Sequence, residues 1–446
     1  MLNSVLSFLV ALGILVFIHE YGHYAVARFF GVRVIRFSIG FGRPILRWTS
    51  AKTGVEWVVS WIPLGGYVRM LDENDPDSLQ GTEGDLSGAF NHKPVLHRMA
   101  IVVAGPLANL LLAALLYSVL SLNQTSVVST RVAAPESSTP AAMAGLQGGD
   151  VIRQVNGTPV QGWGDIEWSV MKAKLFGRDL KLDIERSGTP AHALVSHQAL
   201  DPIEFGPQLG RQAGFAPHET RVLVRNVSES SAAQRAGLAS GDVLLALDGI
   251  AINTAAQVTR YIQSKPGQPV VLDIERAGLP LQIKAIPEEV NNKDGLATGR
   301  LGMALGAQTE IISKSVSVTG ALHEGVGRMV EVSVFSLMAL VKMVTGGLSW
   351  THLSGPVSIA AAAGESSSLG ILPFIAFLAM VSVSLGVLNL LPVPLLDGGH
   401  LMYHFAELVR GKPVSERVQL VGQKIGLSLV AGLTFLALFN DLQRLL

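Results

Sequence analysis

The sequence contains no cysteine, so neither a disulfide framework nor a cysteine-ligated metal site can form. Any metal site must use histidine, aspartate or glutamate. Charge is also scarce: 15% of the residues are charged and 49% are hydrophobic, whereas a soluble protein usually has about a quarter charged. The 34 basic and 34 acidic residues cancel, which argues against a nucleic-acid-binding protein.

Long apolar runs account for the low charge. Four of them are expected to span a membrane as helices: residues 2 to about 30, 99–122, 366–396 and about 420–440. A further apolar stretch, 332–341, is too short to span, and we interpret it as an amphipathic or interfacial helix. The first run lacks a basic leader and a small-residue cleavage site, so we expect it to be retained rather than removed as a signal peptide.

The basic residues predict how the spans are oriented. Lysine and arginine are concentrated in the 31–98 and 397–419 connections. By the positive-inside rule, both connections are expected to be cytoplasmic. Both termini and the 123–365 region would then lie on the other side of the membrane.

The 123–365 region contains an internal repeat of roughly 90 residues. The segment A-G-L-Q-G-G-D-V-I-R-Q-V-N-G at 144–157 aligns with A-G-L-A-S-G-D-V-L-L-A-L-D-G at 236–249, and L-D-I-E-R occurs at both 182–186 and 272–276. Alternating apolar residues and Asn-Gly or Asp-Gly pairs predict strands and hairpins. Each repeat resembles a bacterial PDZ domain, which implies a groove that accepts a peptide as an added strand. The alternative is a domain pair that acts only as a spacer or steric shield.

Near the end of the first span lies an H-E-x-x-H motif, His19-Glu20-Tyr21-Gly22-His23. On a helix, His19 and His23 share a face, so two imidazoles can hold one zinc ion while Glu20 acts on the bound water as general base. The motif also occurs by chance, and a helix with two ordinary histidines is the alternative. Three ionisable groups at the end of an apolar span are costly, however, which favours a metal site.

A hydrolytic zinc site needs a third protein ligand. The end of the third span reads N-L-L-P-V-P-L-L-D-G-G-H over 389–400 and offers Asp397 and His400. Asp397 follows two prolines, which break a helix and free carbonyls where protein or water can satisfy them. We therefore favour Asp397, with His400 as the competing ligand and a helix-capping aspartate as the alternative.

The combination of H-E-x-x-H in the first span and N-x-x-P-x-P-x-x-D-G late in the chain resembles the site-2 protease family. The two PDZ-like repeats between the second and third spans resemble its tandem-PDZ, regulator of sigma-E protease type. This resemblance implies one zinc ion per chain, Glu20 as the catalytic base, and three metal ligands: His19, His23 and Asp397. It also implies that substrate is held by Asn389, Pro392 and Pro394, and by a membrane-associated β-hairpin containing Gly65, Gly66 and Tyr67.

These features predict a multi-span α-helical membrane protein: four transmembrane helices and a membrane-associated β-hairpin region, plus two extracytoplasmic, β-rich PDZ domains. The expected domains are an N-terminal membrane domain (1–122), two PDZ domains (123–217 and 218–310), a linker with an amphipathic helix (311–365) and a C-terminal membrane domain (366–446).

The resemblance implies an intramembrane zinc endopeptidase of the bacterial inner membrane. Its partners would be the bilayer, single-span substrates of the anti-sigma factor type, remnant signal peptides and peptide ligands of the PDZ domains, in an envelope stress response. Nucleic acid is not an expected partner.

Two other functions fit parts of the sequence. A non-enzymatic membrane scaffold could display the PDZ domains and would need no metal. A transporter or ion channel could use His19, Glu20 and Asp397 along a path, but four spans without repeat symmetry argue against it.

Overall fold

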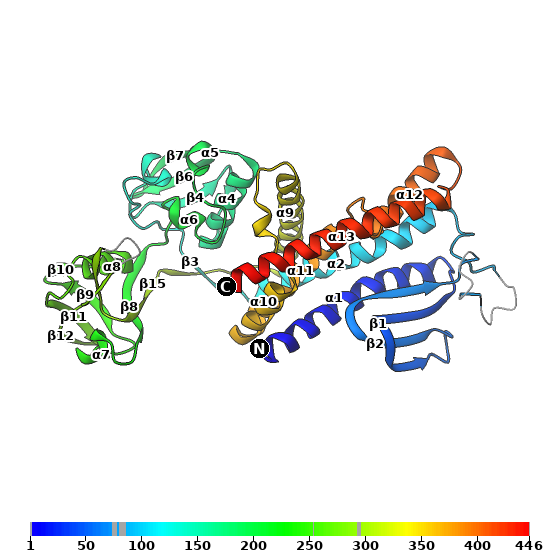
Figure 1. The fold of residues 1–446 in the computed structure, drawn as a ribbon. Helices are drawn as coiled ribbons and strands as arrows, with labels where there is room; N and C mark the ends of the chain where they lie inside the picture. The colour runs from blue at the N-terminus through cyan, green and yellow to red at the C-terminus, as the bar shows by residue number, and fades with distance from the viewer. Residues whose placement is uncertain (1, 74–77, 80–85, 253, 292–295, 446) are drawn as a thin grey trace. The chain divides into compact units, whose positions relative to one another are not determined.

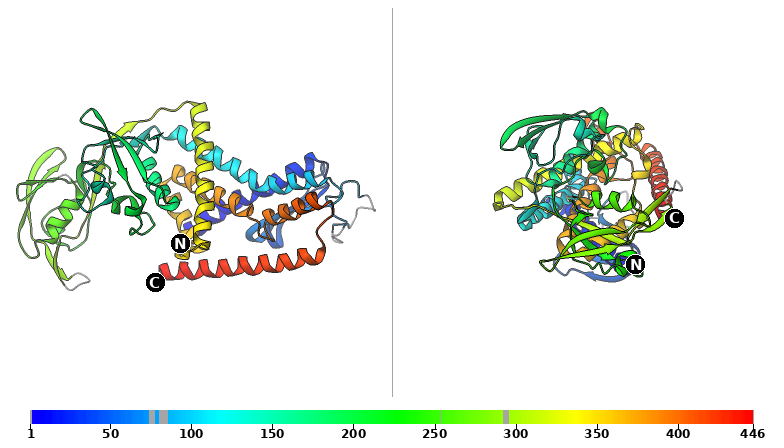
Figure 2. Two further views of the ribbon diagram at one scale, coloured as in Figure 1. Left: turned by 90° about the horizontal axis from the view of Figure 1, so that it is seen from above. Right: turned by 90° about the vertical axis from the view of Figure 1, so that its left-hand side faces the viewer.

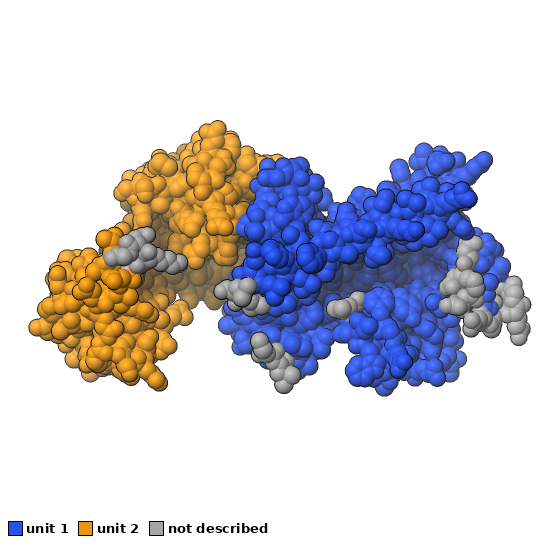
Figure 3. All heavy atoms as spheres, in the orientation of Figure 1, with its two compact units in different colours: residues 1–124, 315–446 blue, residues 125–314 orange. Residues whose placement is uncertain are grey.

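The computed structural model describes residues 2–73, 78–79, 86–252, 254–291 and 296–445. The chain forms two compact units, which Figure 3 shows in different colours. The first unit consists of residues 1–124 and 315–446, and the second of residues 125–314. We call them the helical unit and the repeat unit, and describe each by itself.

Among the described residues, four helices are long and apolar enough to cross a membrane, which confirms the predicted number. They are α1 (Leu2–Phe29), α2 (Val95–Asn123), α11 (Ile371–Asn389) and α13 (Glu416–Leu445). Helix α2 packs against both α1 and α11, and Figure 1 shows it alongside α1. It therefore contacts both the N-terminal and the C-terminal part of the unit.

The third apolar run, 366–396, does not form the single long helix that we expected. Gly370, with a φ of 122°, separates α10 (Pro356–Leu369) from α11. Helix α11 then ends at Asn389 because proline lacks an amide hydrogen and disfavours the helical conformation in the residue before it. The segment 390–396 is irregular, and α12 (Asp397–Arg410) follows it.

The short apolar stretch 332–341 lies within a much longer helix, α9 (Val318–Val344). Helix α9 packs against α2 and α11, and it belongs to the helical unit rather than to the repeat unit. Figure 2 shows α9, in yellow, running across the direction of the other long helices. A 3-10 turn (Trp350–His352) lies between α9 and α10.

A two-stranded antiparallel sheet follows α1 and packs against it. Its strands are β1 (Val34–Thr49) and β2 (Glu56–Met70). Gly40 has a φ of 87° and a methyl group there would lie 2.8 Å from the Ile62 carbonyl oxygen, so glycine is required where the strand pairing becomes irregular. Phe37 is buried between this sheet and α1, which holds the hairpin beside the helix.

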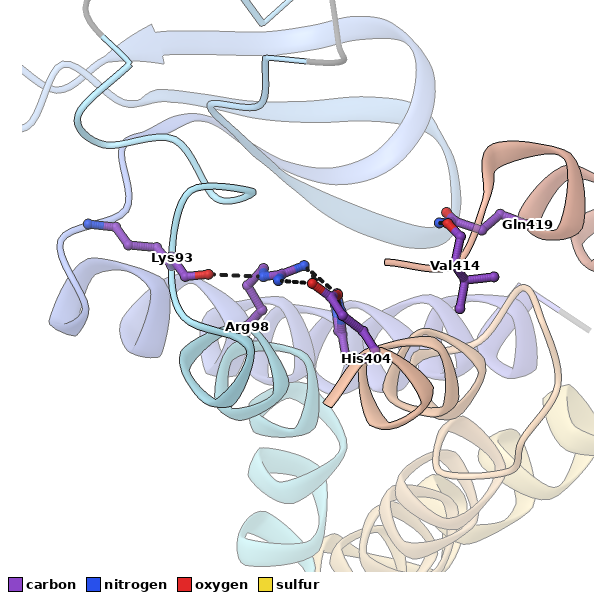
Figure 4. A network of polar contacts seen from close by, with 6 residues as sticks. Lys93, Arg98, His404, Val414 and Gln419 are labelled. Atoms are coloured by element: carbon purple, nitrogen blue, oxygen red, sulfur yellow. Dashed lines mark hydrogen bonds and ion pairs between the residues drawn. The ribbon is translucent and has the colours of Figure 1, made fainter. Parts of the chain in front are cut away.

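An ion pair joins the start of α2 to α12. Figure 4 shows Arg98 donating to the Lys93 carbonyl oxygen and reaching toward His404. The same guanidinium donates two hydrogen bonds, of 2.8 and 3.1 Å, to the carboxylate of Glu407. Arg98 holds the pKa of Glu407 below its ordinary value. Such a bidentate pair fixes orientation as well as distance, so it sets the position of α12 on α2.

The C-terminal end of α13 is joined to the start of α10. Asp441 is buried and accepts hydrogen bonds from the backbone amides of Gly355, Val357 and Ser358, and from the Ser358 hydroxyl. A carboxylate at a helix N-terminus satisfies amides that have no partner within the helix. The contact therefore fixes the C-terminal end of α13 to the N-terminal end of α10.

The repeat unit contains two β-rich domains whose elements follow the same order. The first has sheet order β5-β4-β6-β7 and comprises β4 (Val151–Val155), β5 (Thr158–Pro159), α4 (Trp163–Phe176), β6 (Leu180–Arg186) and β7 (Thr189–Val195). In the second the equivalent elements are β9 (Val243–Leu247), β10 (Ile250–Ala251), α8 (Ala255–Gln263), β11 (Val270–Arg276) and β12 (Leu279–Ala285). The sequence repeat is thus a repeat of structure.

The second domain's sheet is extended by β8 (Glu219–Val227) and β15 (Met303–Thr309), in the order β12-β11-β9-β8-β15. Two short pairs lie beside these sheets: β3 (Ser126–Val128) with β16 (Ile311–Ser313), and β13 (Glu288–Asn291) with β14 (Ala297–Arg300). The remaining short helices are α3 (Pro140–Met143), α5 (His197–Leu200), α6 (Leu209–Gln212) and α7 (Ala232–Arg235).

The two repeated sequence segments are joined by the same contact in each domain. Asp150 pairs with Arg186, and at the equivalent place Asp242 pairs with Arg276. Both aspartates are buried, and each also accepts a 2.8 Å hydrogen bond from a backbone amide three residues earlier. The hydrogen bond from Arg186 lowers the pKa of Asp150. At Asp242 burial acts in the opposite direction but is outweighed by Arg276 and the backbone amide, so its pKa is also lowered.

We expect Asp150→Asn to lower the thermal unfolding midpoint of a 125–314 fragment by roughly 4–8 °C at pH 7. A lowered pKa means that the carboxylate stabilises the fold above its ordinary pKa, and that this stabilisation is lost as the pH falls through the lowered value. The difference from the unsubstituted fragment should therefore shrink as the pH is lowered from 7 to below the ordinary pKa of aspartate. Circular dichroism melts over that pH series measure it.

The matched control is Asp183→Asn. Asp183 pairs with His192 at the surface of the same domain, where ion pairs contribute little. Equal midpoints for Asp150→Asn and Asp183→Asn at pH 7 would contradict the assignment of Asp150 as a structural link.

Candidate metal centre

Two histidine rings from α1 face each other near the C-terminal end of this helix. His19 and His23 are one helical turn apart, and their Nε2 atoms are 3.3 Å from each other. Both side chains are largely buried, with exposed fractions of 13% and 11%. The i, i+4 spacing thus presents two imidazole nitrogens to one point, as the motif predicted.

The third group comes from the other end of the chain. The Oδ2 atom of Asp397, the first residue of α12, lies 3.2 Å from Nε2 of His19 and 3.5 Å from Nε2 of His23. Among the described residues, these three form the only group of histidine, aspartate and glutamate side chains close enough to hold a metal ion. His400, the competing candidate, is exposed and lies outside this group.

The spacing of the three donor atoms fits zinc. With bonds of about 2.0–2.1 Å, neighbouring ligand atoms in a tetrahedral zinc site are about 3.3 Å apart. The three measured distances, 3.2, 3.3 and 3.5 Å, lie close to that value. The Asp397 Oδ2 atom is buried and accepts no hydrogen bond from any described residue, so it is available as a ligand. Catalytic zinc sites have three protein ligands and leave the fourth coordination position to water or substrate. Two imidazoles and one carboxylate fit this pattern.

Helix α2 holds the histidine pair in place through close backbone contacts. At Gly22, a methyl group would lie 2.3 Å from the carbonyl oxygen of Ala104, and at Gly105 one would lie 2.2 Å from Nε2 of His23. Glycine at these two positions lets α1 and α2 approach closely and leaves room for the His23 ring. Nδ1 of His23 lies 2.8 Å from the Ile101 carbonyl oxygen, which accepts its hydrogen and leaves Nε2 free as a ligand.

A further polar residue of α2 reaches the site, and our sequence analysis missed it. Asn109 is fully buried, and its amide nitrogen lies 3.4 Å from Nδ1 of His19. Gly105 was missed as well. The available signal was Asn109 itself, since an amide in an otherwise apolar span needs a partner.

Glu20 is buried beside the two histidines and next to the β-hairpin. A methyl group at Gly66 of β2 would lie 2.8 Å from Cγ of Glu20 and 2.6 Å from the Ser38 carbonyl oxygen. Glycine therefore lets the strand pass directly over the glutamate. Its two neighbours lie against Phe41 instead: Gly65 contacts that ring closely, and the ring of Tyr67 stacks on it at 6.2 Å. The structure thus brings Gly66 to the site and makes Gly65 and Tyr67 part of its support.

The proline-rich segment leads directly into the metal centre. Asn389 ends α11, and Pro392 and Pro394 lie in the irregular segment before Asp397. This segment folds tightly over the start of α12: methyl groups at Gly398 and Gly399 would lie 2.2 and 2.3 Å from the carbonyl oxygens of Leu391 and Val393. The structure gives the side-chain amide of Asn389 no hydrogen bond to any described residue.

Comparisons with known proteins agree with this geometry. The sequence pattern of peptidase family M50 matches residues 7–433. The regulator of sigma-E protease RseP of Escherichia coli strain K12 is 35% identical over 456 residues, which cover 98% of each chain. A Neisseria meningitidis protein whose name includes "zinc metalloprotease" is 39% identical over 459 residues, which cover both chains completely.

Over part of its length the chain is similar to a solved structure, the PDZ domain of the SdrC-like protein from Listeria monocytogenes. The two are 26% identical, with a TM-score of 0.17, over 19% of this chain and 85% of that one. The family match, by contrast, covers nearly the whole chain. The chain therefore belongs to peptidase family M50, the site-2 proteases, and is a zinc metalloprotease.

Proposed function

We propose that this protein is an intramembrane endopeptidase that cleaves transmembrane segments of single-span membrane proteins. The observation that carries the proposal is the convergence of His19, His23 and Asp397 beside Glu20, on elements that adjoin helices long enough to cross a membrane. One zinc ion per chain would be held by these three ligands. Helices of this length and apolarity favour a membrane over water, which supports an intramembrane peptidase rather than a soluble one.

The residues divide the chemistry between them. A zinc ion on this ligand set would polarise the scissile carbonyl and make a water molecule more acidic. Glu20 would take the proton from the attacking water and pass it to the nitrogen of the leaving amine, which balances the hydrolysis. Glu20 is buried and its side chain lies against Gly66, so contact with strand β2 restricts how the side chain can move.

A substrate helix must unwind before it can be cut, because its carbonyls are hydrogen-bonded within the helix. Each backbone group freed in lipid is costly unless it finds a new partner. Strand β2 passes over Glu20 at Gly66 and would offer such partners by strand addition. The amide of Asn389 would hold the strand from the opposite part of the chain, with Pro392 and Pro394 shaping the segment around it.

The relatives and the charge pattern suggest the cellular role. A relative named as a regulator of sigma-E protease points to an anti-sigma factor as substrate, within an envelope stress response of the bacterial inner membrane, and remnant signal peptides would be a second class. The lysine and arginine distribution supports a periplasmic position for both termini and for the repeat unit. There the two domains would act as PDZ modules that bind peptides or exclude bulky substrates.

Glu20→Gln should retain about one zinc ion per chain and lose at least 1,000-fold in cleavage of a tagged single-span substrate, because the amide cannot accept the proton. Purified protein in detergent, analysed for metal and assayed by gel, gives both values. Glu365→Gln serves as the control, because Glu365 is exposed on α10, and it should cleave normally. Near-normal turnover by Glu20→Gln would refute Glu20 as the base.

Size exclusion by the repeat unit predicts a dependence on the substrate's periplasmic part. A substrate with a short periplasmic stub should be cleaved at least 10-fold faster than the same span fused to a folded domain. Deleting residues 125–314 with a short flexible link across the gap should remove the difference. If the intact protein cleaves both substrates at the same rate, the repeat unit is not a size filter.

A further inference from the structure

The side chain of Asn109 is a buried polar group at the metal centre that the proposed chemistry does not use. It lies in the middle of α2, has no exposed surface, and its amide nitrogen is 3.4 Å from Nδ1 of His19. Its amide oxygen, Oδ1, is buried and has no hydrogen-bond partner among the described residues. A buried acceptor without a partner is unfavourable, so its presence in an apolar helix needs an explanation.

The two histidines use their ring nitrogens in parallel ways. In each, Nε2 faces the other histidine and Asp397, and Nδ1 faces α2. A neutral imidazole that binds a metal through Nε2 carries its hydrogen on Nδ1, and that hydrogen needs an acceptor. For His23 the acceptor is the Ile101 carbonyl oxygen at 2.8 Å. For His19 the described residues offer only the amide of Asn109.

The present orientation of that amide suits the other tautomer of His19. An amide nitrogen is a donor, so next to Nδ1 it requires that nitrogen to accept and places the ring hydrogen on Nε2. Nε2 could then not bind a metal. Rotating the amide by 180° exchanges its nitrogen and oxygen at little steric cost, since the two ends are nearly the same size. Oδ1 would then accept the hydrogen from Nδ1, and Nε2 would be free to bind.

We propose that Asn109 is a positioning residue for the zinc ligand His19, and that its amide oxygen accepts the Nδ1 hydrogen of His19 in the metal-bound site. This inference rests on the metal site of the proposed function and extends it. An asparagine can serve both tautomers because it carries a donor and an acceptor. A carboxylate could serve only the metal-binding tautomer, and it would add a negative charge to an apolar helix.

The backbone around Asn109 is fixed well enough for this role. The hydroxyl of Ser382 on α11 donates a 2.7 Å hydrogen bond to the Asn109 carbonyl oxygen, and both residues are completely buried. Helix α11 continues through Asn389 and the proline-rich segment to Asp397. Asn109 therefore contacts one metal ligand through its side chain and, through its backbone, the helix that leads to another.

The test compares metal binding in variants at this position. Asn109→Leu has a similar shape but no acceptor, and zinc affinity measured by competition with a chelator should fall about 10- to 100-fold. The absorption bands of the cobalt-substituted protein should shift, because the His19 ring is no longer held. Asn109→Asp retains an acceptor and should bind zinc within about threefold of the unsubstituted protein. Asn123→Leu, at the exposed end of α2, is the control and should change neither value.

The outcomes separate this proposal from the proposed function. Unchanged zinc affinity and an unchanged cobalt spectrum in Asn109→Leu would overturn the role of Asn109 while leaving the protease intact. Loss of affinity in both Asn109→Leu and Asn109→Asp would also overturn it, because the acceptor would then not be what matters. If Asn109→Leu does not fold, Asn109→Ala gives the same comparison. Failure of the unsubstituted protein to bind zinc would instead remove the metal centre itself.

Discussion

The constraint on which the helical unit depends is the close approach of two imidazoles, His19 and His23, to the carboxylate of Asp397 beside apolar helices. The donors come from α1 and from the start of α12, at opposite ends of the sequence. The buried Oδ2 atom of Asp397 has no hydrogen-bond partner among the described residues unless a cation lies between the three groups. With one, the polar groups satisfy each other, which is what makes them tolerable in an apolar surrounding.

Helix α2 is the element that makes the meeting possible. It touches α1 through Gly22 and Gly105, where any larger residue would separate the two helices. It also carries Arg98, whose bidentate pair with Glu407 holds α12, the helix that begins at Asp397. Contacts of one helix thus reach both halves of the site.

The side chains that meet at the candidate metal site could be selected from the sequence because each is energetically unfavourable in its place. His19, Glu20 and His23 interrupt an uncharged span, and Asp397 follows another one after two prolines. The repeat was equally visible, since Asp150 and Arg186 recur as Asp242 and Arg276 and form the same ion pair in both domains. Four helices long and apolar enough to cross a membrane were also expected from hydropathy alone, and the structure has them.

The features that sequence reasoning missed depend on three-dimensional contacts that leave little trace in composition. The break at Gly370 lies within a run that is apolar on both sides, so hydropathy gave no boundary there. Likewise, Gly105 was an unremarked glycine of a span until the structure placed it against His23. The distance of Asn109 from His19 follows only from how α1 and α2 pack. Helix faces are periodic in sequence, but which partner each face meets is a tertiary property.

Metal stoichiometry tests the central claim most directly. The purified protein, dialysed and analysed for zinc by mass spectrometry, should contain about one ion per chain, and Asp397→Ala should lose it while remaining folded. Asp397 is the decisive position because it alone of the three ligands comes from the C-terminal part of the chain. If Asp397→Ala retained a full equivalent of zinc at unchanged affinity, the convergence seen here would not be a metal site.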